Sequence, residues 1–89
     1  MSMQRDEIEI EILRIFKEQF EIKNPDPDEN LAEAYEFDSI DAIELLKALE
    51  DFLDTELTRE EQKAAMDIRT INQIVNYVED LIEKRKPSA

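Results

Sequence analysis

Ser39 is the residue best placed for chemistry, because it stands at the start of a predicted helix in the string Asp38-Ser39-Ile40-Asp41. The chain has no histidine, and no Gly-x-Ser-x-Gly elbow surrounds this serine, so the sequence offers no means of activating its hydroxyl as a nucleophile. A side chain at a helix start is well exposed, and a phosphate attached there meets free backbone N–H groups at the positive helix end. The pattern therefore favours a serine that another enzyme modifies over a catalytic serine.

The composition excludes several other kinds of chemistry. Cysteine, histidine and glycine are all absent, which removes disulfides, thiolate catalysis, Cys/His zinc sites and Gly-rich phosphate loops. The chain has 11 Lys and Arg against 24 Asp and Glu, and its formal net charge of −13 argues against nucleic acid and anionic membrane surfaces as partners. We expect a protein that is not an enzyme and that has no specific metal site.

The length of 89 residues predicts a single domain over residues 1–89. No apolar run reaches the length of a membrane span, and the polar N-terminus precedes no signal-like stretch. We therefore expect a cytoplasmic monomer.

Hydrophobic periodicity predicts an all-α domain, a four-helix bundle of three longer helices and one short helix. The expected helices cover about residues 3–22, 39–54, 59–66 and 70–85, and residues 23–38 form a loop. The first helix presents one apolar stripe, and Asn24-Pro25-Asp26-Pro27 is expected to end it. The loop carries three expected core anchors: Leu31, Tyr35 and Phe37.

Three helix starts have capping signals. Asp38 can cap the helix that begins at Ser39. Thr58 and Thr70 each stand three residues before a Glu or Gln, which is the capping-box pattern, and so open the third and fourth helices.

The second helix has two apolar faces rather than one. Its core stripe consists of Ala42, Leu45, Leu46, Leu49 and Leu53. Ile40 and Ile43 fall outside this stripe and are bordered by acidic residues. An apolar patch with a charged rim is typical of a partner-docking surface, although single exposed apolar residues are also common on ordinary surfaces.

The string from Asp38 to Leu45 resembles the Asp-Ser-Leu motif, and the helix that follows it, of the acyl carrier protein family. The similarity runs from about residue 8 to about residue 82. It includes Glu18-Gln19-Phe20, Ala48-Leu49-Glu50, Asp54-Thr55-Glu56-Leu57, Ile68-Arg69-Thr70-Ile71 and Tyr77-Val78.

The resemblance implies a carrier with the acyl-carrier-protein-like four-helix bundle. A separate phosphopantetheinyl transferase would attach 4′-phosphopantetheine from coenzyme A to Ser39, and the arm would supply the thiol that the chain lacks. The carrier would hold acyl groups as thioesters and present them to acyl-transferring or acyl-modifying enzymes with basic docking patches, as in fatty-acid, lipid or polyketide-type biosynthesis.

The resemblance also implies roles for residues near Ser39. The partner-docking surface would comprise Asp38, Ile40, Asp41, Ile43, Glu44, Lys47, Glu50, Asp51 and Glu56. Candidates for lining an acyl pocket are Tyr35, Ile43, Leu46 and Ile74, for which ordinary core packing is the equally supported alternative.

Two features depart from the family pattern. The string Tyr35-Glu36-Phe37 stands before Asp38-Ser39 where a glycine is usual, and Lys47 places a positive charge on the acidic face. These departures suggest a specialised carrier.

Three alternatives stay open. An aminoacyl or peptidyl carrier and an unmodified acidic helical adaptor fit the same residues. The acidic run from Asp26 to Asn30 begins like a calcium-binding EF-hand loop, but Leu31 stands where that loop needs glycine, which leaves only weak divalent binding by the crowded acids.

Overall fold

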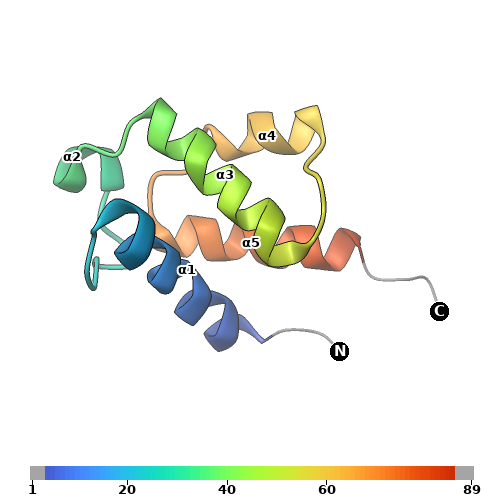
Figure 1. Ribbon diagram of the computed structural model, residues 1–89, viewed down its shortest axis with the longest axis horizontal. Coiled ribbons are helices and arrows are strands. Elements are labelled where there is room, and N and C mark those ends of the chain that lie inside the picture. Colours follow the sequence, from blue (N-terminus) through green and yellow to red (C-terminus); the bar gives the residue numbers. More distant parts are fainter. Residues whose placement is uncertain (1–3, 86–89) are drawn as a thin grey trace.

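A computed structural model describes residues 4–85, and within this range the chain forms five helices and no strand. The helices are α1 (Arg5–Phe20), α2 (Leu31–Tyr35), α3 (Ser39–Leu53), α4 (Arg59–Ala65) and α5 (Ile71–Lys84). α1 packs against α5, and α3 contacts both α1 and α4 (Figure 1). The prediction of an all-helical bundle is confirmed. The predicted start of the first helix, at residue 3, lies outside the described residues.

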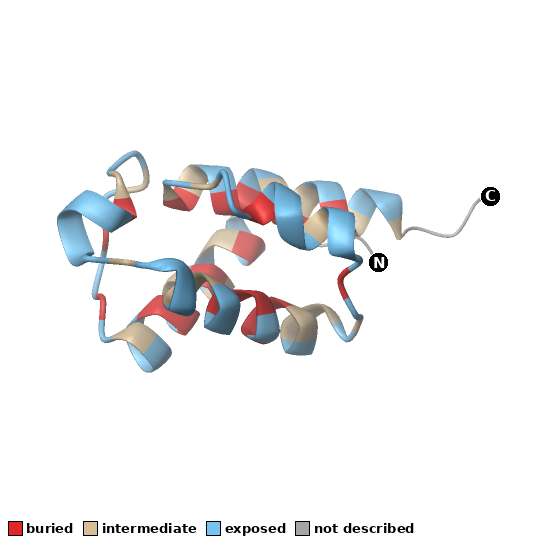
Figure 2. Cartoon of the chain, turned by 90° about the horizontal axis from the view of Figure 1, so that it is seen from above, coloured by how far each residue is buried: buried red, intermediate tan, exposed pale blue. Residues whose placement is uncertain are grey.

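The core lies between the helices, and Figure 2 shows the buried residues facing inward from them. Within residues 4–85 all buried side chains are apolar, and the ring of Pro25 is among them. α1 and α5 each contribute one stripe of buried residues at helical spacing, and these are Ile8, Ile12, Ile15, Phe16, Ile71, Ile74, Val75, Val78 and Leu81. α3 adds Leu45, Leu46, Ala48 and Leu49.

The predicted helix starts are confirmed as reciprocal capping boxes at Asp38, Thr58 and Thr70. Thr58 Oγ1 accepts a hydrogen bond from the N–H of Glu61 at 3.1 Å, and Thr70 Oγ1 accepts one from the N–H of Gln73 at 3.1 Å. Each cap stabilises its helix by about 1 kcal/mol. The caps therefore set where α3, α4 and α5 begin.

The end of α1 differs from the prediction. Glu21 adopts a left-handed backbone with φ 56°, and the N–H of Ile22 then donates to the carbonyl of Phe16 at 3.0 Å. Ile22 is buried, so the early end of the helix places this side chain in the core. The chain has already left the helix before it reaches the prolines, and the prediction that the Pro-containing string ends α1 is wrong.

The segment expected to be a loop contains the short helix α2. The Asn30 side chain accepts a hydrogen bond from the N–H of Glu33 at 3.1 Å, so it caps this helix. The N–H of Leu31 donates to the carbonyl of Arg69 at 2.8 Å, which joins α2 to the segment before α5. The pair Asn30 and Glu33 was the sequence signal for this helix. Leu31 is buried as expected, whereas Tyr35 is exposed rather than a core anchor.

Candidate functional site

Ser39 is the first residue of α3, and its side chain is exposed. The cap of this helix is made by its neighbours. Asp38 Oδ1 accepts from the N–H of Asp41 at 3.0 Å, and Asp41 Oδ2 accepts from the N–H of Asp38 at 3.1 Å. Within residues 4–85 no group forms a hydrogen bond with the Ser39 hydroxyl. The hydroxyl is therefore available for a bond to an external group.

Phe37 fixes the chain just before Ser39. Its ring stacks on Phe16 with the centroids 5.4 Å apart and meets Phe20 edge-on at 5.2 Å. Both partners belong to α1, and aromatic pairs of this kind stabilise by about 1 kcal/mol beyond the burial of their surface. The aromatic cluster therefore ties the approach to α3 to the end of α1.

Glu36 takes the left-handed backbone that a glycine would adopt more easily. Its φ is 56° and ψ is 34°, and its N–H donates to the carbonyl of Leu31 to end α2. The reversal of the chain before Ser39 is thus formed without glycine. A residue with a Cβ atom adopts this conformation at a cost of roughly 1–2 kcal/mol.

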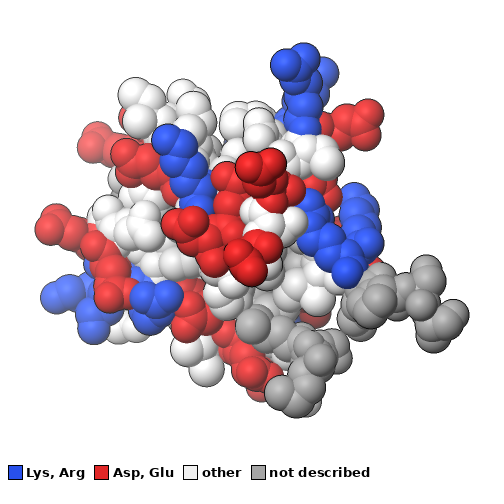
Figure 3. All heavy atoms as spheres, turned by 45° about the vertical axis from the view of Figure 1, so that its right-hand side comes forward, with Lys and Arg blue, Asp and Glu red and all other residues white. Residues whose placement is uncertain are grey.

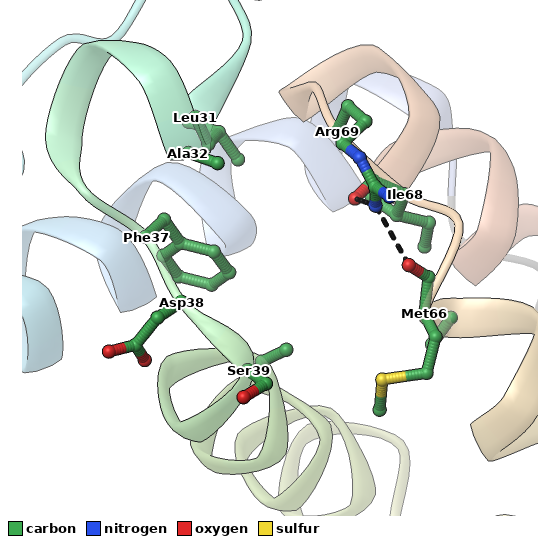
Figure 4. Close-up of a pocket in the computed structure, with 10 residues that line it drawn as sticks. Leu31, Ala32, Phe37, Asp38, Ser39, Met66, Ile68 and Arg69 are labelled. Atoms are coloured by element: carbon green, nitrogen blue, oxygen red, sulfur yellow. Dashed lines mark hydrogen bonds between the residues drawn. The ribbon is translucent and has the colours of Figure 1, made fainter.

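Ser39 borders a pocket of about 310 Å³ between α2, the start of α3 and the segment that joins α4 to α5 (Figure 4). Its walls are Leu31, Ala32, Phe37, Asp38, Ser39, Ala42, Ala65, Met66, Ile68 and Arg69. The sequence analysis did not place Met66 or Arg69 at the site. No local pattern in the sequence pointed to them, because the hydrogen bond that joins this segment to α2 links Leu31 and Arg69, which are distant in the chain.

A smaller apolar cavity of about 30 Å³ shares five wall residues with this pocket and reaches deeper into the core. Leu46 and Ile74 both line it, so the structure brings together two of the four residues proposed for an acyl pocket. Ile43 is exposed on α3 and lies outside its walls. Tyr35 also lies outside and instead lines a groove with Phe20 at the end of α1.

The residues proposed for partner docking lie along α3 and just beyond it, and all are exposed or half-buried. Ile40 and Ile43 are 66% and 49% exposed, which places two large apolar side chains on the surface beside Ser39. On the face drawn in Figure 3, carboxylates gather near the centre, with single basic side chains among and around them. A basic surface of a partner would be attracted to such a face.

Glu50 and Lys47, two of the residues proposed for partner docking, have additional features. Glu50 Oε2 accepts a hydrogen bond from the N–H of Leu57 at 2.8 Å, so this carboxylate also holds the turn after α3. Lys47 is exposed and forms no ion pair within residues 4–85, although Glu44 and Asp51 lie three and four residues away on the same helix. Its charge is therefore presented to solvent.

The N-terminal end of α4 is clamped to α5. Arg85 forms a bidentate pair with the Glu61 carboxylate at 2.7 and 2.8 Å, and the Tyr77 hydroxyl donates to the carbonyl of Glu61 at 2.6 Å. The Arg85 hydrogen bonds lower the pKa of Glu61 to about 2, against the opposing effect of burial. Burial and the nearby Glu61 charge raise the pKa of Tyr77 to about 12. The clamp holds the helix whose last residue, Ala65, lines the pocket at Ser39.

Within the described part of the chain, no group of three or more carboxylates is arranged to hold a metal ion. The helices in the same range are too short or too polar to cross a membrane.

The exposed serine at a helix start and the adjoining pocket agree with the comparison to known families. A family model described as "Phosphopantetheine attachment site" matches residues 11–78, which is most of the chain and includes α3 in full. Domains of this kind carry covalently bound 4′-phosphopantetheine and are carriers. The chain therefore belongs to the phosphopantetheine attachment site family and is a phosphopantetheine carrier protein.

Proposed function

We propose that Ser39 is the attachment residue and that the protein is an acyl carrier. The observation that supports this most directly is the free, exposed hydroxyl of Ser39 at the mouth of a pocket, on a helix that its neighbours already cap. The remaining described hydroxyls at helix starts, those of Thr58 and Thr70, are occupied as caps. When bound, the arm supplies a terminal thiol that holds a cargo as a thioester.

The residues around Ser39 fit such a group. The pocket of about 310 Å³ has the size of a small-molecule site and combines an apolar wall with polar groups at its rim. Asp38 keeps the first turn of α3 in place through its own hydrogen bonds, so modification of Ser39 removes no contact from the fold.

An acyl cargo is supported by the apolar cavity behind the pocket. Its walls include Leu45, Leu46, Leu49 and Ile74, and no charged side chain is among them. With about 30 Å³ the cavity has to widen to admit a hydrocarbon chain, which then gains from the burial of apolar surface, whereas the ammonium group of an aminoacyl cargo would have to be desolvated there. An aminoacyl or peptidyl carrier is the second candidate, because the arm can hold these cargoes without using the cavity.

The proposed partners are a phosphopantetheinyl transferase and acyl-transferring or acyl-modifying enzymes with basic docking patches. The acidic face of α3 beside Ser39 supports this, because complementary charge accelerates encounter. We propose that the protein is a cytoplasmic monomer and that it serves biosynthesis of the fatty-acid, lipid or polyketide type.

Intact mass spectrometry tests the attachment site. The chain is incubated with coenzyme A and a broad-specificity transferase, with Ser39→Ala as the control. We expect the mass of one phosphopantetheine group to be added to the wild type only. No gain in the wild type supports an unmodified adaptor, and a gain in Ser39→Ala shows a different attachment residue.

Thermal unfolding then separates the two kinds of cargo. Loading with medium-chain acyl groups should raise the melting temperature above that of the thiol form, and loading with an aminoacyl group should not. Replacement of Ile74 by Val removes one methylene from the wall of the cavity and should therefore change the size of the rise in melting temperature that the acyl group causes. Equal melting temperatures for both cargoes would contradict binding in the cavity.

A further inference from the structure

Arg69 is the one basic residue among those that line the pocket of Ser39. It belongs to the segment between α4 and α5, and Figure 4 shows it across the pocket from Ser39. The other charged residue of the lining is Asp38. A charged group added at Ser39 therefore faces one cation and one carboxylate in the same pocket.

Several hydrogen bonds hold Arg69 in place. Its N–H donates to Gln73 Oε1 at 2.6 Å, and its carbonyl accepts from the N–H of Leu31 at 2.8 Å. Its Nη1 donates to the carbonyls of Met66 at 2.8 Å and Ile68 at 2.9 Å. The guanidinium is thus oriented by backbone atoms rather than by a carboxylate.

Arg69 forms no ion pair within residues 4–85. Arg5, Arg14 and Arg85 each pair with a carboxylate, whereas Arg69 contacts only neutral oxygens. Its Nε–H and Nη2 groups have no acceptor within residues 4–85. The fixed fork of donors in a guanidinium matches the oxygens of a phosphate better than a lysine ammonium does.

The negative charges around Ser39 favour a cation at this position. A phosphodiester at Ser39 adds a negative charge beside the carboxylates of Asp38 and Asp41, which form the cap of α3. The positive end of the helix offsets part of this charge, but both carboxylates already use it. We propose that Arg69 is a positioning residue that pairs with the phosphodiester at Ser39 and so holds the arm over the pocket. This inference rests on the proposed attachment at Ser39.

Phosphorus NMR of the modified protein tests the pairing. The samples are the wild type, Arg69→Gln, Arg69→Lys and Arg59→Gln, each loaded with phosphopantetheine to completion as judged by intact mass. Arg59 is the matched control, because it is also exposed and forms no ion pair within the described part of the chain, but lies outside the pocket.

We expect the phosphorus resonance of Arg69→Gln to shift toward that of the same phosphodiester in the urea-unfolded modified protein and to narrow, while Arg59→Gln matches the wild type. Arg69→Lys should lie between them, because it keeps the charge but loses the fork. High salt should shift the wild-type resonance in the same direction as Arg69→Gln, since it screens an exposed pair.

A second measurement excludes a merely structural role. Arg69→Gln also loses two hydrogen bonds to carbonyls near the end of α4, so its unmodified form will be less stable than the wild type. The test is therefore the difference in melting temperature between the modified and the unmodified form of each variant. This difference should be at most half of the wild-type difference in Arg69→Gln and equal to it in Arg59→Gln.

The outcomes separate the two proposals. If the mass confirms attachment at Ser39 and the phosphorus resonance is the same in the wild type and Arg69→Gln, the role of Arg69 is wrong and the attachment site stands. If the wild type never gains the arm at Ser39, both proposals are overturned.

Discussion

Replacement of Glu61 by Gln tests the clamp that holds the N-terminal end of α4 against α5. The Glu61 side chain is only 10% exposed and accepts two hydrogen bonds from Arg85 and one from the N–H of Thr58. Gln keeps the shape and one acceptor oxygen but loses the charge. The substitution therefore removes the ionic interaction and one of the two hydrogen bonds from Arg85, with little change in packing.

The magnitude follows from the pKa. A pKa of about 2 for Glu61 against an ordinary value of 4.5 corresponds to roughly 3 kcal/mol of unfolding free energy at neutral pH. The Arg85 side chain keeps 27% of its surface exposed, and solvent screening lowers our expectation to about 2 kcal/mol. Arg85 still bonds Thr55 Oγ1 and the carbonyl of Glu56, so it is not left without partners.

The stability that Glu61 contributes decreases as the pH falls. The pKa of Glu61 is lower in the folded than in the unfolded chain, so its contribution is complete above about pH 4.5 and is lost as the pH falls toward 2. The difference in stability between the wild type and Glu61→Gln should therefore be largest at pH 7 and fall to less than half of that value near pH 3.

Urea unfolding followed by far-UV circular dichroism measures this difference at both pH values. Glu60→Gln is the matched control, because it lies next in the sequence and is exposed on the surface of α4. The reasoning is refuted if the two variants have equal stability at pH 7, or if the effect of Glu61→Gln is the same at pH 3 as at pH 7.

Three further predictions concern the docking face, the core and the loop before Ser39. Glu44→Lys should slow the attachment of phosphopantetheine at low salt without unfolding the protein, as measured by mass against time, while Glu9→Lys on α1 should not; equal rates would count against docking on α3. Ile74→Ala should lower the unfolding free energy by about 2–4 kcal/mol because Ile74 is fully buried, whereas Ile40→Ala should change it by less than about 0.5 kcal/mol; similar losses in urea titrations would contradict the assigned burial. Glu36→Gly should leave stability unchanged or raise it by up to about 1 kcal/mol, and a clear loss in melting temperature would show that the left-handed backbone is not strained.

The sequence predicts the features that depend on neighbours along the chain. The caps at Asp38, Thr58 and Thr70 and the buried stripes of α1 and α5 follow from spacing alone, because these interactions join residues within a few positions. The exposure of Ile40 and Ile43 follows in the same way from the helical period.

The features that the sequence did not predict depend on contacts between distant segments. Arg69 reaches the pocket of Ser39 only because α2 bonds to the segment before α5, a pairing of residues 38 positions apart in the chain. The left-handed conformations of Glu21 and Glu36 were missed because glutamate rarely adopts them, and burial of neighbours such as Ile22 outweighs that preference.

The division of roles between Asp38 and Ser39 has a consequence for how the protein is used. Since the hydrogen bonds at the start of α3 are made by the Asp38 and Asp41 carboxylates and not by the Ser39 hydroxyl, the fold does not depend on a group attached to Ser39. Removal of the arm would likewise return an intact fold, so one polypeptide can pass through repeated cycles of charging and stripping. With the arm on Ser39, as we propose, variation at position 39 should abolish carrier function and leave the fold intact, whereas variation at position 38 should also weaken the start of α3.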